Sequence, residues 1–274
     1  MRLFSEEVVS MFSKKFPLIF FIYLFSTTFC FAAEIKQGTI SGRWITKDYG
    51  PMGGALVLLF NKSVGPPPSS EKYLRVPDAT AIIEADGQFS VLAAAGSYYL
   101  VMRKSSVGDT VGPPQDGDLQ YYSRDKMGKA RSFHIKSGGI TDIGTISEAT
   151  VFRKQQTKYV KGMTAIEGTV TDGEGLPVEG VRVFVYTSPG MAGRPRYASE
   201  GTGKDGKYFV NVNNKGIYYL KARSRYGGGQ PEAGEFMGGY GEPTAPAVVK
   251  VEKGKIRKGI DIKTKRFPGR GSNE

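Results

Sequence analysis

The sequence predicts an all-β protein made of two tandem antiparallel β-sandwich domains of about seven strands each. Short strand-like segments separated by turn signals run along most of the chain, and no sustained helical period interrupts them. One phrase also occurs twice: it reads DGQFSVLAAAGSYYLVMRK from Asp86 and DGKYFVNVNNKGIYYLKAR from Asp205. A repeat of this size indicates two copies of one module.

The chain begins with the pattern of a signal peptide over residues 1–33. Lys14 and Lys15 precede the apolar run PLIFFIYLFSTTFCF, and the small residues Ala32 and Ala33 follow it. The apolar run is about 15 residues long, short of the roughly 20 that a membrane-spanning helix needs. We therefore expect export to the periplasm, the outer surface or the medium, with no membrane span after cleavage.

Three alternatives for this leader stay open. The segment could be retained as an anchor, or translation could start at Met11, directly ahead of the lysines. Cys30 could carry a lipid, although the preceding Thr27-Thr28-Phe29 is a poor match to the triplet that such sites use.

The first copy is expected over residues 34–150. Its strands are expected at 39–44, at 55–60, after the Asp86-Gly87 turn, through Tyr98-Tyr99-Leu100, at 133–138 and near Ile143. The 55–60 segment is apolar throughout, as a strand covered on both faces would be. A Gly- and Pro-rich loop is expected at 105–124.

The second copy is expected over residues 165–264, after a linker at 151–164 and before a basic tail at 265–274. Its strands are expected at 165–170, at 181–186, after the Asp205-Gly206 turn, through Tyr218-Tyr219-Leu220, at 249–254 and near Ile260. The second irregular loop is expected at 227–246.

Alternation along the repeated phrase assigns each side chain to a face. The Asp-Gly pairs fit hairpin turns, because Gly accepts a positive φ without steric cost. The side chains expected in the core are Phe89, Val91, Tyr98, Leu100 and Met102, matched by Tyr208, Val210, Val212, Tyr218, Leu220 and Ala222. Those expected to point outward are Tyr99, Val101 and Arg103, matched by Tyr219, Lys221 and Arg223.

With these strands placed, the second copy resembles the carboxypeptidase regulatory-like domain, a prealbumin-like seven-stranded sandwich. The matching pieces are IEGTV (166–170), LPVEGVRV (176–183), DGKY (205–208) and GIYYL (216–220). The first copy matches less well, departing in its opening turn at 47–54.

The resemblance implies an accessory module of surface or periplasmic proteins that has no catalytic residues of its own. Some relatives form an internal Lys–Asn or Lys–Asp bond from a lysine in the first strand, but Gly168-Thr169-Val170-Thr171 contains no lysine. Related sandwiches include starch-binding domains, so the resemblance leaves sugar binding open.

Composition limits the chemistry that the chain can perform. Without the leader there is no cysteine, so disulfides and thiolate metal sites are excluded. The single histidine, His134, is expected to point to solvent between inward Phe133 and Ile135. The segments Asp116-Gly117-Asp118 and Asp172-Gly173-Glu174 lack the regular ligand series of a calcium loop, so ordinary turns are expected. We expect no catalytic residue, metal site or cofactor.

What remains is a possible binding surface of aromatic and arginine side chains, which can anchor a sugar ring or a protein partner. Its candidate residues are Tyr99, Arg103, Tyr121, Tyr122, Tyr219, Arg223, Tyr226, Phe236 and Tyr240. The alternative is that the loop aromatics fold back and cover the sheet.

The sequence therefore predicts a non-enzymatic, exported structural or binding protein of the bacterial cell envelope. The net charge of +12 falls to +11 when residues 1–33, with three basic and two acidic residues, are removed. Such a charge suits a polysaccharide or acidic protein partner, and export argues against nucleic acid. The alternatives are a carbohydrate-binding module and an accessory subunit that docks an acidic envelope complex.

Overall fold

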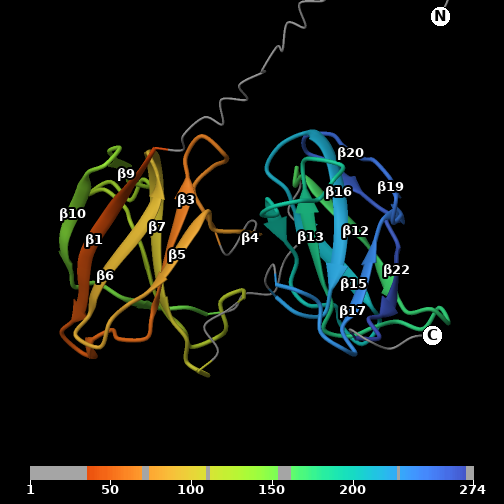
Figure 1. Ribbon diagram of the computed structural model, residues 1–274, viewed down its shortest axis with the longest axis horizontal. Coiled ribbons are helices and arrows are strands. Elements are labelled where there is room, and N and C mark those ends of the chain that lie inside the picture. The colour runs from red at the N-terminus through yellow and green to blue at the C-terminus, as the bar shows by residue number, and fades with distance from the viewer. Residues whose placement is uncertain (1–35, 70–73, 109–111, 154–161, 227–228, 270–274) are drawn as a thin grey trace, which may run out of the picture. The chain divides into compact units, whose positions relative to one another are not determined.

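The regular elements of the described chain are all β-strands, which confirms the predicted fold class (Figure 1). The computed structural model describes residues 36–69, 74–108, 112–153, 162–226 and 229–269. Within these ranges, no helix has the length and hydropathy needed to cross a membrane. The expected signal peptide, including Cys30, lies outside the described residues.

Two sheets with a shared apolar interior form the first sandwich. One has the order β10-β1-β6 with β2 on β1, and the other has the order β11-β8-β7-β3-β5 with β9 on β7. Its core includes Trp44, Leu59 and Leu100, all fully buried. The strands of this part of the chain are β1 (Gln37–Thr46), β2 (Gly50–Pro51), β3 (Leu56–Asn61), β4 (Leu74–Arg75), β5 (Ala79–Ile82), β6 (Gln88–Ala94), β7 (Gly96–Lys104), β8 (Leu119–Tyr122), β9 (Ser132–Ile135), β10 (Ile140–Ile146) and β11 (Thr150–Val151).

The second sandwich encloses a separate core around Ile166, Val183 and Leu220. Its strands follow the order β15-β12-β22-β17-β16-β13-β14, with β20 on β16 and β21 on β12. They are β12 (Ala165–Thr171), β13 (Arg182–Tyr186), β14 (Tyr197–Ala198), β15 (Lys207–Asn211), β16 (Gly216–Arg223), β17 (Phe236–Gly239), β18 (Gly241–Glu242), β19 (Ala245–Pro246), β20 (Val249–Val251), β21 (Ile256–Arg257) and β22 (Ile262–Arg266).

The two sandwiches use the same pairing register. β1 pairs with β6 so that Gly42 lies opposite Phe89, and β12 pairs with β15 so that Gly168 lies opposite Tyr208. The repeated Tyr-Tyr-Leu strands, β7 and β16, pair with β3 and β13 in the same way. Most pairs are antiparallel, and in each sandwich the first strand also has a parallel partner, β10 for β1 and β21 with β22 for β12.

The repeated phrase is a tight Asp-Gly turn followed by a core strand in both copies, but the expected hairpin is wrong. β6 pairs with β1 and β5 with β3, whereas β15 pairs with β12 and β14 with β13, so each turn joins strands that are not paired with each other. Gly87 and Gly206 have φ of 86° and 68°, and a Cβ at these positions would lie 2.7 Å from Trp44 O and 2.5 Å from Val170 O. Only glycine combines this backbone conformation with so close an approach. All the side chains expected in the core from the phrase are buried.

The first tyrosine of each Tyr-Tyr-Leu segment has a second function besides packing. The Tyr98 hydroxyl donates to Ala94 O at 2.9 Å, and the Tyr218 hydroxyl donates to Asn214 O at 2.8 Å. Each bond ties the core strand to the backbone that leads into it. A buried hydroxyl needs such a partner, which explains why the phrase has tyrosine here in both copies.

Two segments expected to be irregular contain strands. β8 lies within the 105–124 loop, and β17, β18 and β19 lie within the 227–246 loop. β17 reads Phe-Met-Gly-Gly, which has little strand propensity, but it is paired on both sides, with β16 and with β22. Pairing and packing here override local propensity.

Two expected boundaries also need correction. β11 and the buried Phe152 belong to the first sandwich, although the sequence predicts a linker over 151–164. β22 continues to Arg266, into the expected tail, because it pairs there with Phe236 of β17. The middle of the linker and the end of the tail lie outside the described residues.

Candidate functional site

Arg103, expected on an exposed surface, is buried at the end of β7 and is only 5% exposed. Its Nη1 donates to Gly112 O at 2.5 Å, and its Nε lies 3.8 Å from Asp118 Oδ2. Asp118 is itself buried and accepts hydrogen bonds from the backbone N–H groups of Ser106 and Gln115. The loop after β7 therefore folds over the arginine and is held by it.

Arg223 occupies the equivalent position at the end of β16 and is also buried. Its Nε and Nη2 donate to the two carboxylate oxygens of Glu235 at 2.6 and 2.9 Å, and its Nη1 donates to Gly229 O at 3.0 Å. The hydrogen bond to Glu235 raises the pKa of Arg223 above its ordinary value. Bidentate geometry of this kind is the strongest that an arginine forms with a carboxylate.

These two arginines therefore do not present an exposed surface to a ligand. Alternation assigns them correctly to the outer face of the sheet, but the loop that follows each strand supplies an acid that covers it. The sequence signal for this arrangement is the recurrence, in both copies, of Arg at the end of the core strand with an acid later in the loop.

The tyrosines expected on the outer face are half-buried in equivalent positions. Tyr99 lies opposite Phe60 across the β7–β3 pair, and Tyr219 lies opposite Tyr186 across the β16–β13 pair. Both copies thus place an aromatic pair on the outer surface of the sheet, where such pairs stabilise strand association.

The remaining candidates serve mainly as packing groups. Phe236 and Tyr240 pack against the second core, and the Arg266 guanidinium lies 4.4 Å from the Phe236 ring centroid. Tyr121 packs against the first core. These contacts favour the alternative in which loop aromatics fold back over the sheet.

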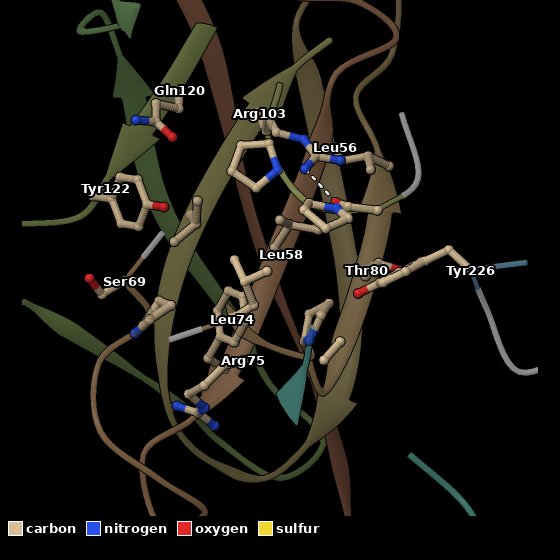
Figure 2. A pocket seen from close by; sticks show the side chains of 18 residues that line it. Leu56, Leu58, Ser69, Leu74, Arg75, Thr80, Arg103, Gln120, Tyr122 and Tyr226 are labelled. Atoms are coloured by element: carbon tan, nitrogen blue, oxygen red, sulfur yellow. Dashed lines mark hydrogen bonds between the residues drawn. The ribbon is translucent and has the colours of Figure 1, made fainter. Parts of the chain in front are cut away.

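Three of the candidates, Arg103, Tyr122 and Tyr226, meet at one cavity of about 190 Å³ (Figure 2). The cavity lies against the outer face of the β3–β7 sheet and also touches two residues of the second sandwich. The residues that line it are Leu56, Leu58, Phe60, Pro68, Ser69, Leu74, Arg75, Pro77, Thr80, Val101, Arg103, Gly112, Pro113, Pro114, Gln120, Tyr122, Ala198 and Tyr226.

The cavity explains the uninterrupted apolar run of β3. Val57 and Leu59 point into the first core, whereas Leu56, Leu58 and Phe60 line the cavity on the opposite face. The outer face of this strand is thus apolar because it is covered, as the sequence indicates. The lining residues on β3 are not among the predicted site residues, although their apolar run is the signal that could have identified them.

Arg75 fixes the segment that covers this face. Its Nη1 donates to Pro66 O at 2.6 Å, its Nη2 donates to Asn61 O at 3.1 Å, and its guanidinium lies 5.4 Å from the Phe60 ring centroid. The strand that contains it, β4, pairs with β14 of the second sandwich, where Arg75 lies opposite Tyr197.

Tyr226 reaches the cavity from the end of β16. Its ring centroid lies 5.6 Å from that of Phe184, and the Arg182 guanidinium lies 5.7 Å from the Tyr226 ring centroid. Burial raises the pKa of the Tyr226 hydroxyl, and the charges of Arg103 and Arg182 oppose that shift. The phenol therefore stays neutral at physiological pH.

The lining of this cavity is mainly apolar. Its lining holds no Asp, Glu, His, Cys or Lys among the described residues. Asp, Glu, His and Cys are the residue types that most often bind metal ions in proteins. Across the described part of the chain, no group of three or more His, Cys, Asp or Glu side chains is placed to hold a metal ion.

The other residues considered for chemistry have ordinary positions. His134 is exposed on β9 between buried Phe133 and Ile135, as expected. The Asp172 carboxylate accepts hydrogen bonds from the backbone N–H groups of Glu174 and Leu176, both at 2.9 Å, which is the geometry of a turn.

No family model matches the chain, and no curated protein matches it either. Among solved structures, the Bacillus anthracis TIE protein matches 85% of this chain at 12% identity and a TM-score of 0.26, and the chain spans 34% of that protein. BcpA, the major pilin subunit of Bacillus cereus, matches 85% of this chain and 100% of its own length at 12% identity, with a TM-score of 0.26. A streptococcal ancillary pilin covers 86% of this chain and 64% of its own length at 12% identity, with a TM-score of 0.23. Scores this low carry no argument about function.

Proposed function

We propose that the protein is a non-enzymatic, exported structural or binding protein of the bacterial cell envelope, built from two carboxypeptidase regulatory-like sandwiches. One observation carries the proposal: the cavity that gathers three of the predicted site residues is lined mainly by aliphatic, aromatic, proline and arginine side chains. Such a lining suits the binding of an apolar group and contains no carboxylate or imidazole.

The two buried arginines support the same role. Arg103 and Arg223 are held in ion pairs that fix the long loops, so they are engaged in the fold itself. A scaffold that fixes its loops in this way presents a pre-ordered surface, which lowers the entropic cost of binding.

Export is tested by cell fractionation of a carboxy-terminally tagged full-length chain in a bacterial host. We expect the tagged protein in the periplasm, the envelope or the medium, shortened by the length of the leader. Full-length protein confined to the cytoplasm would contradict the proposal. Turnover of ester, peptide or glycoside substrates that is lost in His134→Ala would contradict its non-enzymatic part.

A second candidate function, docking of an acidic envelope partner, is favoured by a concentration of positive charge near the carboxy-terminal end. Over 250–266, eight basic residues accompany only Glu252 and Asp261. All eight are exposed: Lys250, Lys253, Lys255, Arg257, Lys258, Lys263, Lys265 and Arg266.

Exposed charges are screened beyond about 8 Å at physiological ionic strength. An acidic partner captured from the envelope fraction is therefore expected to wash off at high salt. A partner that stays bound at high salt would point to apolar docking instead.

A further inference from the structure

A polar groove of about 440 Å³ lies beside β8, separate in character from the apolar cavity. We call it the tyrosine groove. Its lining consists of Pro68, Ser69, Gln120, Tyr121, Tyr122, Arg124, Asp125, Glu148, Ala149 and Thr150. Its volume falls within the roughly 300–1,000 Å³ of small-molecule sites.

The groove opens where a strand pairing stops. β11 pairs with β8 only at Thr150–Gln120 and Val151–Leu119, so the next residues of β8, Tyr121 and Tyr122, extend past that ladder. The segment that precedes β11 is anchored elsewhere, because the Trp44 indole Nε1–H donates to Glu148 O at 3.0 Å. The folded chain therefore holds these two segments apart, and the space between them is the groove.

Several polar side chains of the groove are positioned by the protein itself. The Arg124 guanidinium lies 6.0 Å from the Tyr122 ring centroid, and its Nη1 donates to Gly128 O at 2.9 Å. Asp125 Oδ1 accepts hydrogen bonds from the backbone N–H groups of Met127 and Lys129 at 3.0 and 2.9 Å. A site ordered in advance loses less entropy when it binds.

The groups in the groove complement a sugar. Tyrosine rings offer apolar faces for the C–H faces of a pyranose. Gln120 and Thr150 can both donate and accept, Arg124 donates, and the carboxylates of Asp125 and Glu148 accept. Sugar hydroxyls also donate and accept, so they match this mixture better than a purely apolar or purely ionic ligand does.

The charge of the groove determines whether it suits a neutral or an anionic sugar. The groove contains two carboxylates, Asp125 and Glu148, and one guanidinium, Arg124, so its net charge is negative although the chain as a whole is positive. Carboxylates lining the same groove as a uronate would repel it. We infer that the tyrosine groove binds a short neutral oligosaccharide. The inference rests on the proposed binding role and adds a ligand class and a site to it.

The test uses the full mature chain and four probes: cellotetraose, maltotetraose and chitotetraose as neutral ligands, and tetragalacturonate as the anionic one. Calorimetric titration is expected to show saturable binding of at least one neutral probe and none of tetragalacturonate. Trp44 is the only tryptophan of the chain and is hydrogen-bonded to the wall of the groove, so its emission is expected to change on binding.

Glu148→Gln removes an exposed charged acceptor while keeping the shape of the side chain. It is expected to weaken the binding of the neutral probe by about fivefold, because a hydrogen bond to a charged acceptor is replaced by a weaker bond to a neutral one. Glu84→Gln, an exposed acid of the same sandwich outside the groove, is the matched control and is expected to leave binding unchanged.

Failure of all three neutral probes to bind would overturn the inference, as would tighter binding of tetragalacturonate or an equal loss in Glu84→Gln. None of these outcomes bears on fractionation of the tagged chain, so a failure of this inference is distinguishable from a failure of the proposed export. Because Glu148 is exposed, unchanged melting of Glu148→Gln is expected and shows that any loss of binding is not caused by unfolding.

Discussion

Arg223 and Glu235 form a tightly bonded charged pair in the second sandwich, with side chains only 9% and 1% exposed. Removing one member of such a pair leaves the other charge buried without its counter-charge, which commonly costs about 3–5 kcal/mol. Replacing both members with apolar groups avoids that penalty, because neither charge is then desolvated.

We therefore expect Glu235→Ala to destabilise the protein by about 3 kcal/mol, measured as the free energy of unfolding in urea. The double variant Arg223→Met/Glu235→Leu is expected to recover most of that loss. A Glu235→Ala variant as stable as the parent would show that the loop after β16 does not depend on this ion pair.

Tyr218 allows a pH prediction with a definite sign. Burial raises the pKa of Tyr218 to about 12, whereas an unfolded tyrosine titrates near pH 10. Between these values the folded chain keeps the proton and the unfolded chain releases it, so stability falls as the pH rises through the window. Tyr208, whose pKa burial also raises, adds to the same fall.

Tyr218→Phe is expected to cost about 1 kcal/mol at pH 8, because the hydrogen bond to Asn214 O is lost. From pH 10 to 12 the variant is expected to lose less stability than the parent, since one of the titrating hydroxyls is gone. Urea unfolding at a series of pH values measures both effects. Equal slopes for parent and variant would contradict the assignment of the alkaline loss to this residue.

At the scale of the element, the Asp-Gly turns fix the start of the core strands β6 and β15. In each turn the aspartate accepts a hydrogen bond from the backbone N–H two residues on, Asp86 from Gln88 and Asp205 from Lys207. Gly206 combines a positive φ with a close approach to Val170 O. A Cβ at this position would therefore cause both conformational strain and steric overlap, and the two destabilising effects are expected to add.

Three alanine substitutions separate these effects. Gly190→Ala is expected to be nearly neutral, because Gly190 has no positive φ and no atom lies within 4 Å of the place that a Cβ would take. Gly175→Ala, at φ 88° in open space, is expected to cost about 1 kcal/mol from strain alone. Gly206→Ala is expected to cost about 2 kcal/mol or more. Thermal melting of the three variants gives the order, and a Gly206→Ala effect no larger than that of Gly175→Ala would exclude the overlap.

The elements also show which features alternation can predict. The inward positions of the repeated phrase, such as Phe89 and Val210, follow directly from a period of two, because each sheet has one face on a core. For Arg103 the same pattern predicts the correct face but does not predict that the side chain is covered there. The alternation along a strand predicts the face from which a side chain points. It cannot predict that the Arg103 side chain is covered by Asp118, because Asp118 belongs to the loop that follows the strand.

The cavity could not be predicted, for the same reason. Its walls come from β3, from β4 and from Tyr226, which are distant in sequence and meet only in the folded chain. The apolar run of β3 indicates that something covers its outer face but contains no information on which segment does so. The tyrosine groove likewise depends on the point where the β8–β11 ladder ends.

At the scale of the whole molecule, the two cores are separate clusters, but backbone pairing and arginine hydrogen bonds join the segments around them. β4 pairs with β14, Arg194 Nη1 donates to Pro77 O at 2.7 Å, and Arg196 Nη1 donates to Val64 O at 2.7 Å. Two independent cores predict that each sandwich keeps its fold without a covalent link. The cross-contacts predict that the sandwiches nevertheless stay associated.

Replacing residues 154–161 with a protease site tests both expectations. After cleavage, the halves are expected to elute together from a sizing column at micromolar concentration, although they lose the high effective concentration that a linker provides. Arg194→Ala/Arg196→Ala is expected to make them elute separately, because two donors to backbone carbonyls of the first sandwich are gone. Arg43→Ala, which removes only a surface ion pair with Asp86, is the control and should leave the halves together. Halves that separate at once in the parent would mean that the covalent connection, rather than the β4–β14 pairing and its arginines, keeps the sandwiches joined.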